Sequence, residues 1–119
     1  MWTYRQSSGE MSNATQVWLG YSGVYNWAGL GWKTPQAIKD VGPIPVGRYS
    51  IGSETTEIGP VTLPLTPAAS NEMFGRSGFR IHGEADAHPG HASSGCIVMS
   101  YACREAIVAS QDTELEVIS

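Results

Sequence analysis

Glycine and proline interrupt this chain often enough to favour a fold built from many short strands. The 119 residues include 14 glycines and 7 prolines, while charged residues make up only 15%. Such a turn-rich, charge-poor composition is typical of mainly β domains. The length suits one domain with one core, so we expect residues 1–119 to fold as a single mainly β unit.

The charge and hydropathy patterns exclude several classes of partner. The net charge is −4, so no basic face is expected for nucleic acid or anionic lipid. No apolar segment is long enough to span a membrane. Residues Met1–Gln6 have neither the basic nor the apolar part of a signal peptide. We therefore expect synthesis in the cytoplasm without a signal peptide.

Six short segments have the pattern of strands. They are Thr3–Gln6, Gln16–Tyr21, Arg48–Gly52, Val61–Thr66, Gly78–His82 and Glu114–Ile118. The first two are expected to form a hairpin through a turn at Ser7–Glu10. Pro64 lacks a ladder donor and pushes its strand toward a sheet edge. In Gly78–His82 the alternation places Phe79 and Ile81 on one face and Arg80 and His82 on the other.

A helical pattern follows, from Cys96 to Ser110, and residues 33–40 can hold one further helical turn. This pattern predicts that Cys96 lies in the first turn of the helix. The unpaired N–H groups and the dipole at a helix N-terminus favour negative charge on a sulfur atom.

Cys96 and His82 carry the strongest chemical signal in the chain. Ser93, Ser94 and Gly95 precede the cysteine, and His82 ends a predicted strand and is followed by Gly83. A thiol nucleophile needs a base, and the acyl group that it attacks needs N–H donors for an oxyanion. We interpret Cys96 as the nucleophile, His82 as the base, and the backbone around Gly95 as the oxyanion hole.

Simpler interpretations compete with this one. A lone cysteine is usually buried and structural, and a lone histidine usually lies at the surface. A metal site would use His82, His88, His91 and Cys96, but their spacing lacks the paired ligand pattern, so no metal or cofactor is expected. Cys103 has no flanking glycine and is expected to be packed and inert. Were Cys96 and Cys103 on one helix, they would lie too far apart for a disulfide.

Arg76 and Arg80 flank the predicted site and have two possible roles. Either can form an ion pair with Glu84 or Asp86, the common fate of an arginine near carboxylates. Either can also receive a substrate carboxylate through its planar guanidinium. The aromatic residues are expected to serve mainly in core and loop packing: Trp18, Tyr21, Tyr25, Trp27 and Trp32.

Three segments resemble the catalytic domains of L,D-transpeptidases. They are residues 42–51 (GPIPVGRYSI), 73–83 (MFGRSGFRIHG) and 92–99 (ASSGCIVM), in that order. The nearest likeness is to the compact branch that includes peptidoglycan-targeting toxins of type VI secretion systems. That branch also begins with a strand like Trp2–Gln6, so the likeness covers nearly the whole chain.

The resemblance implies a β-sandwich or partly closed barrel with one short helix after the catalytic cysteine. It implies that Cys96 attacks the bond between the L-centre of the diamino acid and D-alanine in a peptidoglycan stem tetrapeptide. A thioester forms, and water (L,D-carboxypeptidase) or an amine (exchange, transpeptidation) accepts the acyl group. His82 corresponds to the base, and Gly95 and Ser94 correspond to the oxyanion-hole loop.

Two departures from housekeeping members of that family bear on function. Ser94 stands where those enzymes carry a second histidine, and the ten residues from Gly83 to Ala92 form a shorter loop than theirs. Both departures favour stem trimming or exchange over wall cross-linking. A toxin would act in the periplasm of a target bacterium and would have a cognate immunity protein as partner.

Two other functional classes stay open at this stage. A non-catalytic wall-binding module of the same fold would not need an intact Cys96 and His82. A papain-like amidase usually has its cysteine before its histidine in the sequence, whereas here His82 comes first.

Overall fold

The computed structural model describes residues 1–23, 36–39, 41–84 and 95–119. Within these ranges the chain forms short strands and one helix. They are β1 (Trp2–Arg5), β2 (Glu10–Ser12), β3 (Val17–Leu19), β4 (Tyr21–Ser22), β5 (Gly47–Ile51), β6 (Leu63–Pro67), β7 (Arg80–His82), β8 (Ile97–Val98), α1 (Tyr101–Ser110) and β9 (Glu114–Ile118). None of the helical residues described forms a segment long and apolar enough to cross a membrane.

The strands form one strongly curved sheet in the order β3-β2-β1-β9-β5-β6-β7-β8-β4. Its two end strands, β3 and β4, are separated in sequence by Gly20 alone, and the Gly20 N–H donates to the Gly9 carbonyl at 2.8 Å. The sheet therefore curls into a nearly closed barrel, which confirms the prediction of a mainly β, partly closed fold with one short helix.

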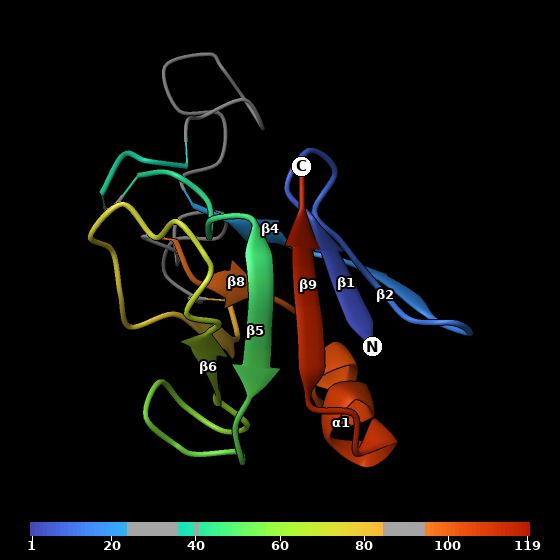
Figure 1. Ribbon diagram of the computed structural model, residues 1–119. Helices are drawn as coiled ribbons and strands as arrows, with labels where there is room; N and C mark the ends of the chain where they lie inside the picture. Colours follow the sequence, from blue (N-terminus) through green and yellow to red (C-terminus); the bar gives the residue numbers. More distant parts are fainter. Residues whose placement is uncertain (24–35, 40, 85–94) are drawn as a thin grey trace.

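The last strand lies in the middle of this sheet, as Figure 1 shows for β9 between β1 and β5. β9 runs parallel to β1 and antiparallel to β5, with Leu115 opposite both Trp2 and Tyr49. Glu114–Ile118 was predicted as a strand with the same bounds, and this prediction is confirmed. The C-terminal strand thus joins the N-terminal hairpin to the strands that carry the site.

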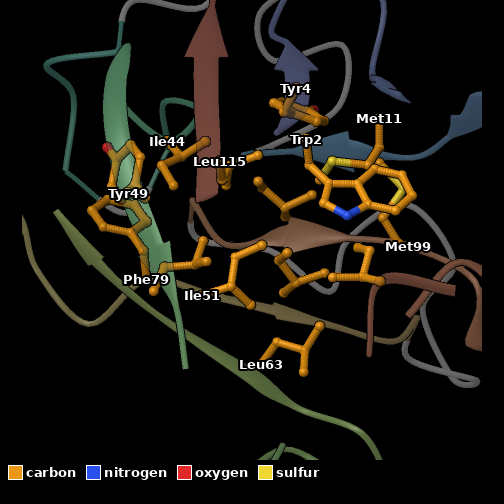
Figure 2. Packing of buried hydrophobic residues seen from close by; sticks show 14 of the residues in the cluster. Trp2, Tyr4, Met11, Ile44, Tyr49, Ile51, Leu63, Phe79, Met99 and Leu115 are labelled. Atoms are coloured by element: carbon orange, nitrogen blue, oxygen red, sulfur yellow. The ribbon is translucent and has the colours of Figure 1, made fainter. Parts of the chain in front are cut away.

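The core fills the inside of the barrel, and every second residue of the central strands contributes to it. Trp2 and Tyr4 from β1 are fully buried, as are Leu115 and Val117 from β9 to within a few per cent. Figure 2 shows Trp2, Tyr4 and Leu115 in one cluster with labelled side chains from β5, β6 and the segment after β8. Burying a large apolar side chain contributes about 1.5–3 kcal/mol.

The predicted N-terminal hairpin differs from the observed one. The chain turns at Gly9, which has φ +77°, and returns at once as β2, with Arg5 opposite Glu10. The turn predicted at Ser7–Glu10 is confirmed for residues 7–9, but Glu10 already begins β2, whose Met11 is fully buried in the core. The predicted second strand becomes β3 and pairs with β2, because both edges of β1 are already occupied by β2 and β9.

The prediction of a helix from Cys96 is wrong for its first residues. Ile97 and Val98 form β8, which lies between β7 and β4, and α1 begins only at Tyr101. Both residues are β-branched and buried, which suits a central strand. Ser100 caps the helix by accepting a hydrogen bond from the Cys103 N–H at 3.2 Å. Cys96 therefore precedes a strand and does not lie at a helix N-terminus.

The prediction that Pro64 moves its strand to an edge is also wrong. β6 lies between β5 and β7. The Pro64 carbonyl accepts a hydrogen bond from the Gly52 N–H at 2.8 Å, so the ladder uses the acceptor of Pro64 and does not need its missing donor.

Some expectations lie wholly or partly outside the described residues. Of the predicted helical turn at 33–40, only residues 36–39 are described, and they form turns. Among the aromatic residues expected to pack, Tyr21 is buried and Trp18 packs against the core, whereas Tyr25, Trp27 and Trp32 are not described.

Candidate active site

A cavity of about 330 Å³ brings Cys96 and His82 together. Its wall is formed mainly by the chain from Gly75 to His82, which runs into β7. The described lining residues are Lys39, Ile58, Gly75, Arg76, Ser77, Gly78, Phe79, Arg80, His82 and Cys96. The cavity therefore combines a thiol, an imidazole and three cationic side chains.

The parallel pairing of β7 with β8 explains why the two predicted residues meet. Ile81 lies opposite Ile97, and His82 lies opposite Val98. The same register places Cys96, one residue before β8, beside Arg80. Ile81 and Ile97 are fully buried on the core face, so Arg80, His82 and Cys96 belong to the other face. The predicted alternation in Gly78–His82 is thus confirmed.

The backbone carbonyl of the next residue, Gly83, orients the His82 ring. The side chain is only 3% exposed, and Nδ1 lies 2.8 Å from the Gly83 carbonyl oxygen. Because a carbonyl only accepts hydrogen bonds, Nδ1 carries the proton and Nε2 keeps its lone pair. Burial lowers the pKa of His82, and the charges of Arg104 and Arg80 lower it further, against the opposing effects of the Gly83 hydrogen bond and Glu84. The imidazole is therefore neutral at neutral pH and can act as a base.

Cys96 is a half-buried thiol in the same cavity as His82, and its Sγ lies 3.8 Å from the Gly78 carbonyl oxygen. Burial raises the pKa of Cys96, while the Arg80 backbone and the charges of Arg80 and Arg76 oppose that rise. The expected lowering by a helix N-terminus does not occur, because α1 begins at Tyr101. The thiol is thus protonated in the resting site and needs a base to take its proton during attack.

Arg80 forms an ion pair with Glu57, whereas the two carboxylates considered from the sequence were Glu84 and Asp86. The Nε and Nη2 of Arg80 donate to the two carboxylate oxygens of Glu57 at 3.1 and 2.9 Å. Its Nη1 donates to the Gly78 carbonyl at 3.0 Å. About a quarter of the Arg80 side chain remains exposed (28%), at the wall of the cavity.

Arg76 connects the cavity wall by hydrogen bonds to residues 36–43 of the chain. The side chain is 6% exposed, and its guanidinium donates to the carbonyls of Gln36 at 2.5 Å, Pro43 at 2.7 Å and Gly42 at 2.9 Å. It also lies 5.1 Å from the centre of the Phe79 ring, within the range of a cation–π contact. These contacts hold the wall of the cavity in place.

Gly95 is required by this arrangement. It has φ +135°, and a Cβ at this position would overlap Nη2 of Arg76 and lie 2.9 Å from Cε1 of Phe79. The Ser22 hydroxyl donates to the Gly95 carbonyl at 2.7 Å and accepts from the Ile44 N–H at 2.8 Å. Gly95 therefore lets the chain before Cys96 pass close to a buried guanidinium.

Several predicted residues fall outside the description. Ser93 and Ser94 of the predicted oxyanion hole, and His88 and His91, lie within residues 85–94. The oxyanion hole therefore remains a prediction. In the part of the chain that is described, no group of three His, Cys, Asp or Glu side chains is arranged to hold a metal ion.

Sequence reasoning missed two charged residues near the site. Glu57 pairs with Arg80 from a position 23 residues away in sequence, and nothing local marks it. Arg104 is 7% exposed and its charge acts on His82. The sequence feature that could have identified Arg104 is its position between Cys103 and Ile107, which are both buried in the core.

The fold and this site define a small, mainly β domain with a cysteine and a histidine in one cavity. A family model, described as the Tlde1 domain, matches residues 16–118. The chain therefore belongs to the Tlde1 domain family, which is a family of type VI secretion effectors. Comparison with curated proteins and with solved structures yields no match.

Proposed function

We propose that this effector is a cysteine acyltransferase or peptidase that acts on peptidoglycan stem tetrapeptides. The observation that carries the proposal is the shared cavity of Cys96 and His82, with the thiol protonated and the imidazole neutral. Such a pair suits nucleophilic attack assisted by a general base. The stem as substrate comes from the resemblance to L,D-transpeptidases and from membership of an antibacterial effector family.

In the proposed reaction, Cys96 and His82 act together in two steps. His82 takes the Cys96 proton at Nε2 while the sulfur attacks the carbonyl carbon of the L-centre of the diamino acid. The carbon–nitrogen bond to D-alanine then breaks, the imidazolium returns the proton to the leaving nitrogen, and a thioester remains. Water or an amine attacks the thioester, gives its proton to His82, and releases the thiol.

The charge of the cavity supports an anionic substrate. Lys39, Arg76 and Arg80 are the charged residues of its described lining. A peptide stem carries carboxylates, and a guanidinium binds a carboxylate well. Because Arg76 already donates to three carbonyls, Arg80 is the better candidate for contact with substrate. It would exchange Glu57 for a carboxylate of the stem.

The place of action follows from the substrate. Peptidoglycan lies outside the cytoplasm, so an effector of this kind would act in the periplasm of a target bacterium. The producing cell would need a cognate immunity protein, and the cavity around Cys96 is the surface that such a partner would cover. A non-catalytic wall-binding module is the alternative, and it predicts that no covalent intermediate forms.

A trapped intermediate tests the proposal. The protein is mixed with a purified disaccharide tetrapeptide, quenched in acid, and weighed intact by mass spectrometry. We expect the mass of a disaccharide tripeptide acyl group on the wild type and on Cys103→Ala, but not on Cys96→Ala. An adduct that persists in Cys96→Ala, or is lost only in Cys103→Ala, would refute the assignment of the nucleophile.

A further inference from the structure

A second cavity, of about 300 Å³, meets the first at His82. The two cavities share His82 and Ile58 in their linings. The remaining lining of the second comes from Gly59, Pro60, Gly83, Glu84 and Arg104. Cys96 lines only the first of these two cavities, so His82 borders both the cavity that holds the thiol and this second space.

The hydrogen bonds of Arg104 to described residues use Nε and Nη1 but not Nη2. Nε donates to the carbonyls of Met99 at 3.2 Å and Ser100 at 3.4 Å, and Nη1 donates to those of Pro60 at 2.5 Å and Val61 at 3.3 Å. Nη2 makes no hydrogen bond to any residue that the structure describes. Among the described side chains, Nη2 of Arg104 is not one of the buried nitrogen or oxygen atoms that lack a partner, so it is accessible from the cavity and can donate to an acceptor that enters there.

Gly83 leaves room for that nitrogen beside His82. A Cβ at position 83 would lie 2.7 Å from Nη2 of Arg104, so a larger residue would displace the guanidinium. The positive charge of Arg104 also contributes to the lowered pKa of His82. Both observations place the guanidinium next to the base.

The second cavity has charges of both signs. Glu84 lines it with Arg104, and the Tyr21 hydroxyl donates to a Glu84 carboxylate oxygen at 2.5 Å. A guanidinium binds a carboxylate, and a carboxylate binds an amine or ammonium group. An amino acid carries both groups on one carbon, and a cavity of about 300 Å³ has room for a small one.

We propose, on the basis of the proposed function, that Arg104 binds the α-carboxylate of the D-amino acid on the leaving side of the scissile bond. The ligand is the D-alanine that departs from the stem, or a free D-amino acid that replaces it. In either case the α-nitrogen lies at His82, which gives it a proton on departure and takes one on entry. Arg104 then makes the reaction favour stems that end in a free carboxylate.

Substrate pairs that differ only in that carboxylate test the assignment. D-Alanine release is measured from a stem tetrapeptide and from its C-terminal amide. We expect the wild type to prefer the acid by about tenfold or more in kcat/KM, because a charge-assisted hydrogen bond is lost with the amide. Arg104→Gln should lose the preference while still cleaving the amide. Arg48→Gln, which removes an exposed arginine on β5, should keep it.

Exchange reactions separate the two sources of the carboxylate. Incorporation of D-methionine is compared with that of D-methioninamide in the same proteins. If the wild type prefers D-methionine to its amide in exchange and Arg104→Gln abolishes that preference, the site binds the incoming amino acid. If Arg104→Gln abolishes the preference for the acid stem in hydrolysis, the site binds the leaving D-alanine. Equal use of acid and amide by the wild type in both reactions, or an unchanged preference in Arg104→Gln, would overturn the proposal.

A binding measurement decides the matter even if no stem is turned over. D-Alanine is titrated into the protein while the His82 ring signals are followed by NMR. We expect a saturable shift in the wild type, and a dissociation constant for D-alanine that is at least about tenfold higher in Arg104→Gln. Should that variant fail to fold, Arg104→Lys keeps the charge without the planar donor pair, and we expect the same weakening. No shift in the wild type would overturn the inference, whereas failure of turnover with an intact shift would count against the proposed function alone.

Discussion

The shifted pKa values of Cys96 and His82 decide how a reaction can begin at this site. Burial lowers the pKa of His82 below its usual value near 6.5, so the imidazole gains a proton only in acid. An imidazolium cannot accept the thiol proton. We therefore expect kcat/KM for D-alanine release to fall as the pH drops through the His82 pKa, with a midpoint below about 6.5, and to be level near neutrality. A midpoint above about 7 would contradict this assignment.

The same reasoning predicts the ionisation state of the thiol. Burial raises the pKa of Cys96, and it raises that of Cys103 to about 12. At pH 7 the thiolate absorbance near 240 nm should be nearly absent, and it should appear above about pH 9. Cys96→Ala supplies the blank and should lack that rise. One full equivalent of thiolate at pH 7 would instead indicate a preformed ion pair with protonated His82.

At the scale of elements, a glycine with positive φ precedes each of β7 and β8, and the two differ in how much space surrounds them. Gly78 and Gly95 both have positive φ, but a Cβ meets nothing within 4 Å at Gly78 and overlaps the Arg76 guanidinium at Gly95. We expect Gly78→Ala to lower the free energy of unfolding by about 1 kcal/mol, and Gly95→Ala by about 3 kcal/mol or more. Urea unfolding of both variants measures the difference. Equal losses would show that the Arg76 contact does not constrain Gly95.

The elements also show how far sequence reasoning reaches. Alternation in Gly78–His82 correctly predicted which side chains of β7 face the core, because the pattern is local. β8 was missed because two β-branched residues before a helix fit a helical pattern as well as a strand, and only pairing with β7 and β4 decides between them. The roles of Glu57 and Arg104 depend on contacts between segments far apart in sequence, which no local pattern encodes.

At the scale of the whole molecule, the family and the proposed chemistry predict where the protein is harmful. The proposed substrate, the peptidoglycan stem, would be met in the periplasm, so the proposal predicts that the same chain acts differently in two compartments. We expect growth arrest or lysis of a Gram-negative host when the protein is produced with an added export signal, and little effect when it is produced in the cytoplasm. Exported Cys96→Ala should be harmless. Equal toxicity of that variant, or toxicity confined to the cytoplasm, would point to another target.

The central claim is that Cys96 cleaves the bond between the L-centre of the diamino acid and D-alanine, and the stems themselves test it most directly. Purified muropeptides are incubated with the protein or with Cys96→Ala and analysed by mass spectrometry. We expect tetrapeptide stems to lose one D-alanine, or to exchange it for an added D-amino acid, only with the wild type. Unchanged tetrapeptides with both proteins would contradict the claim and favour a wall-binding module.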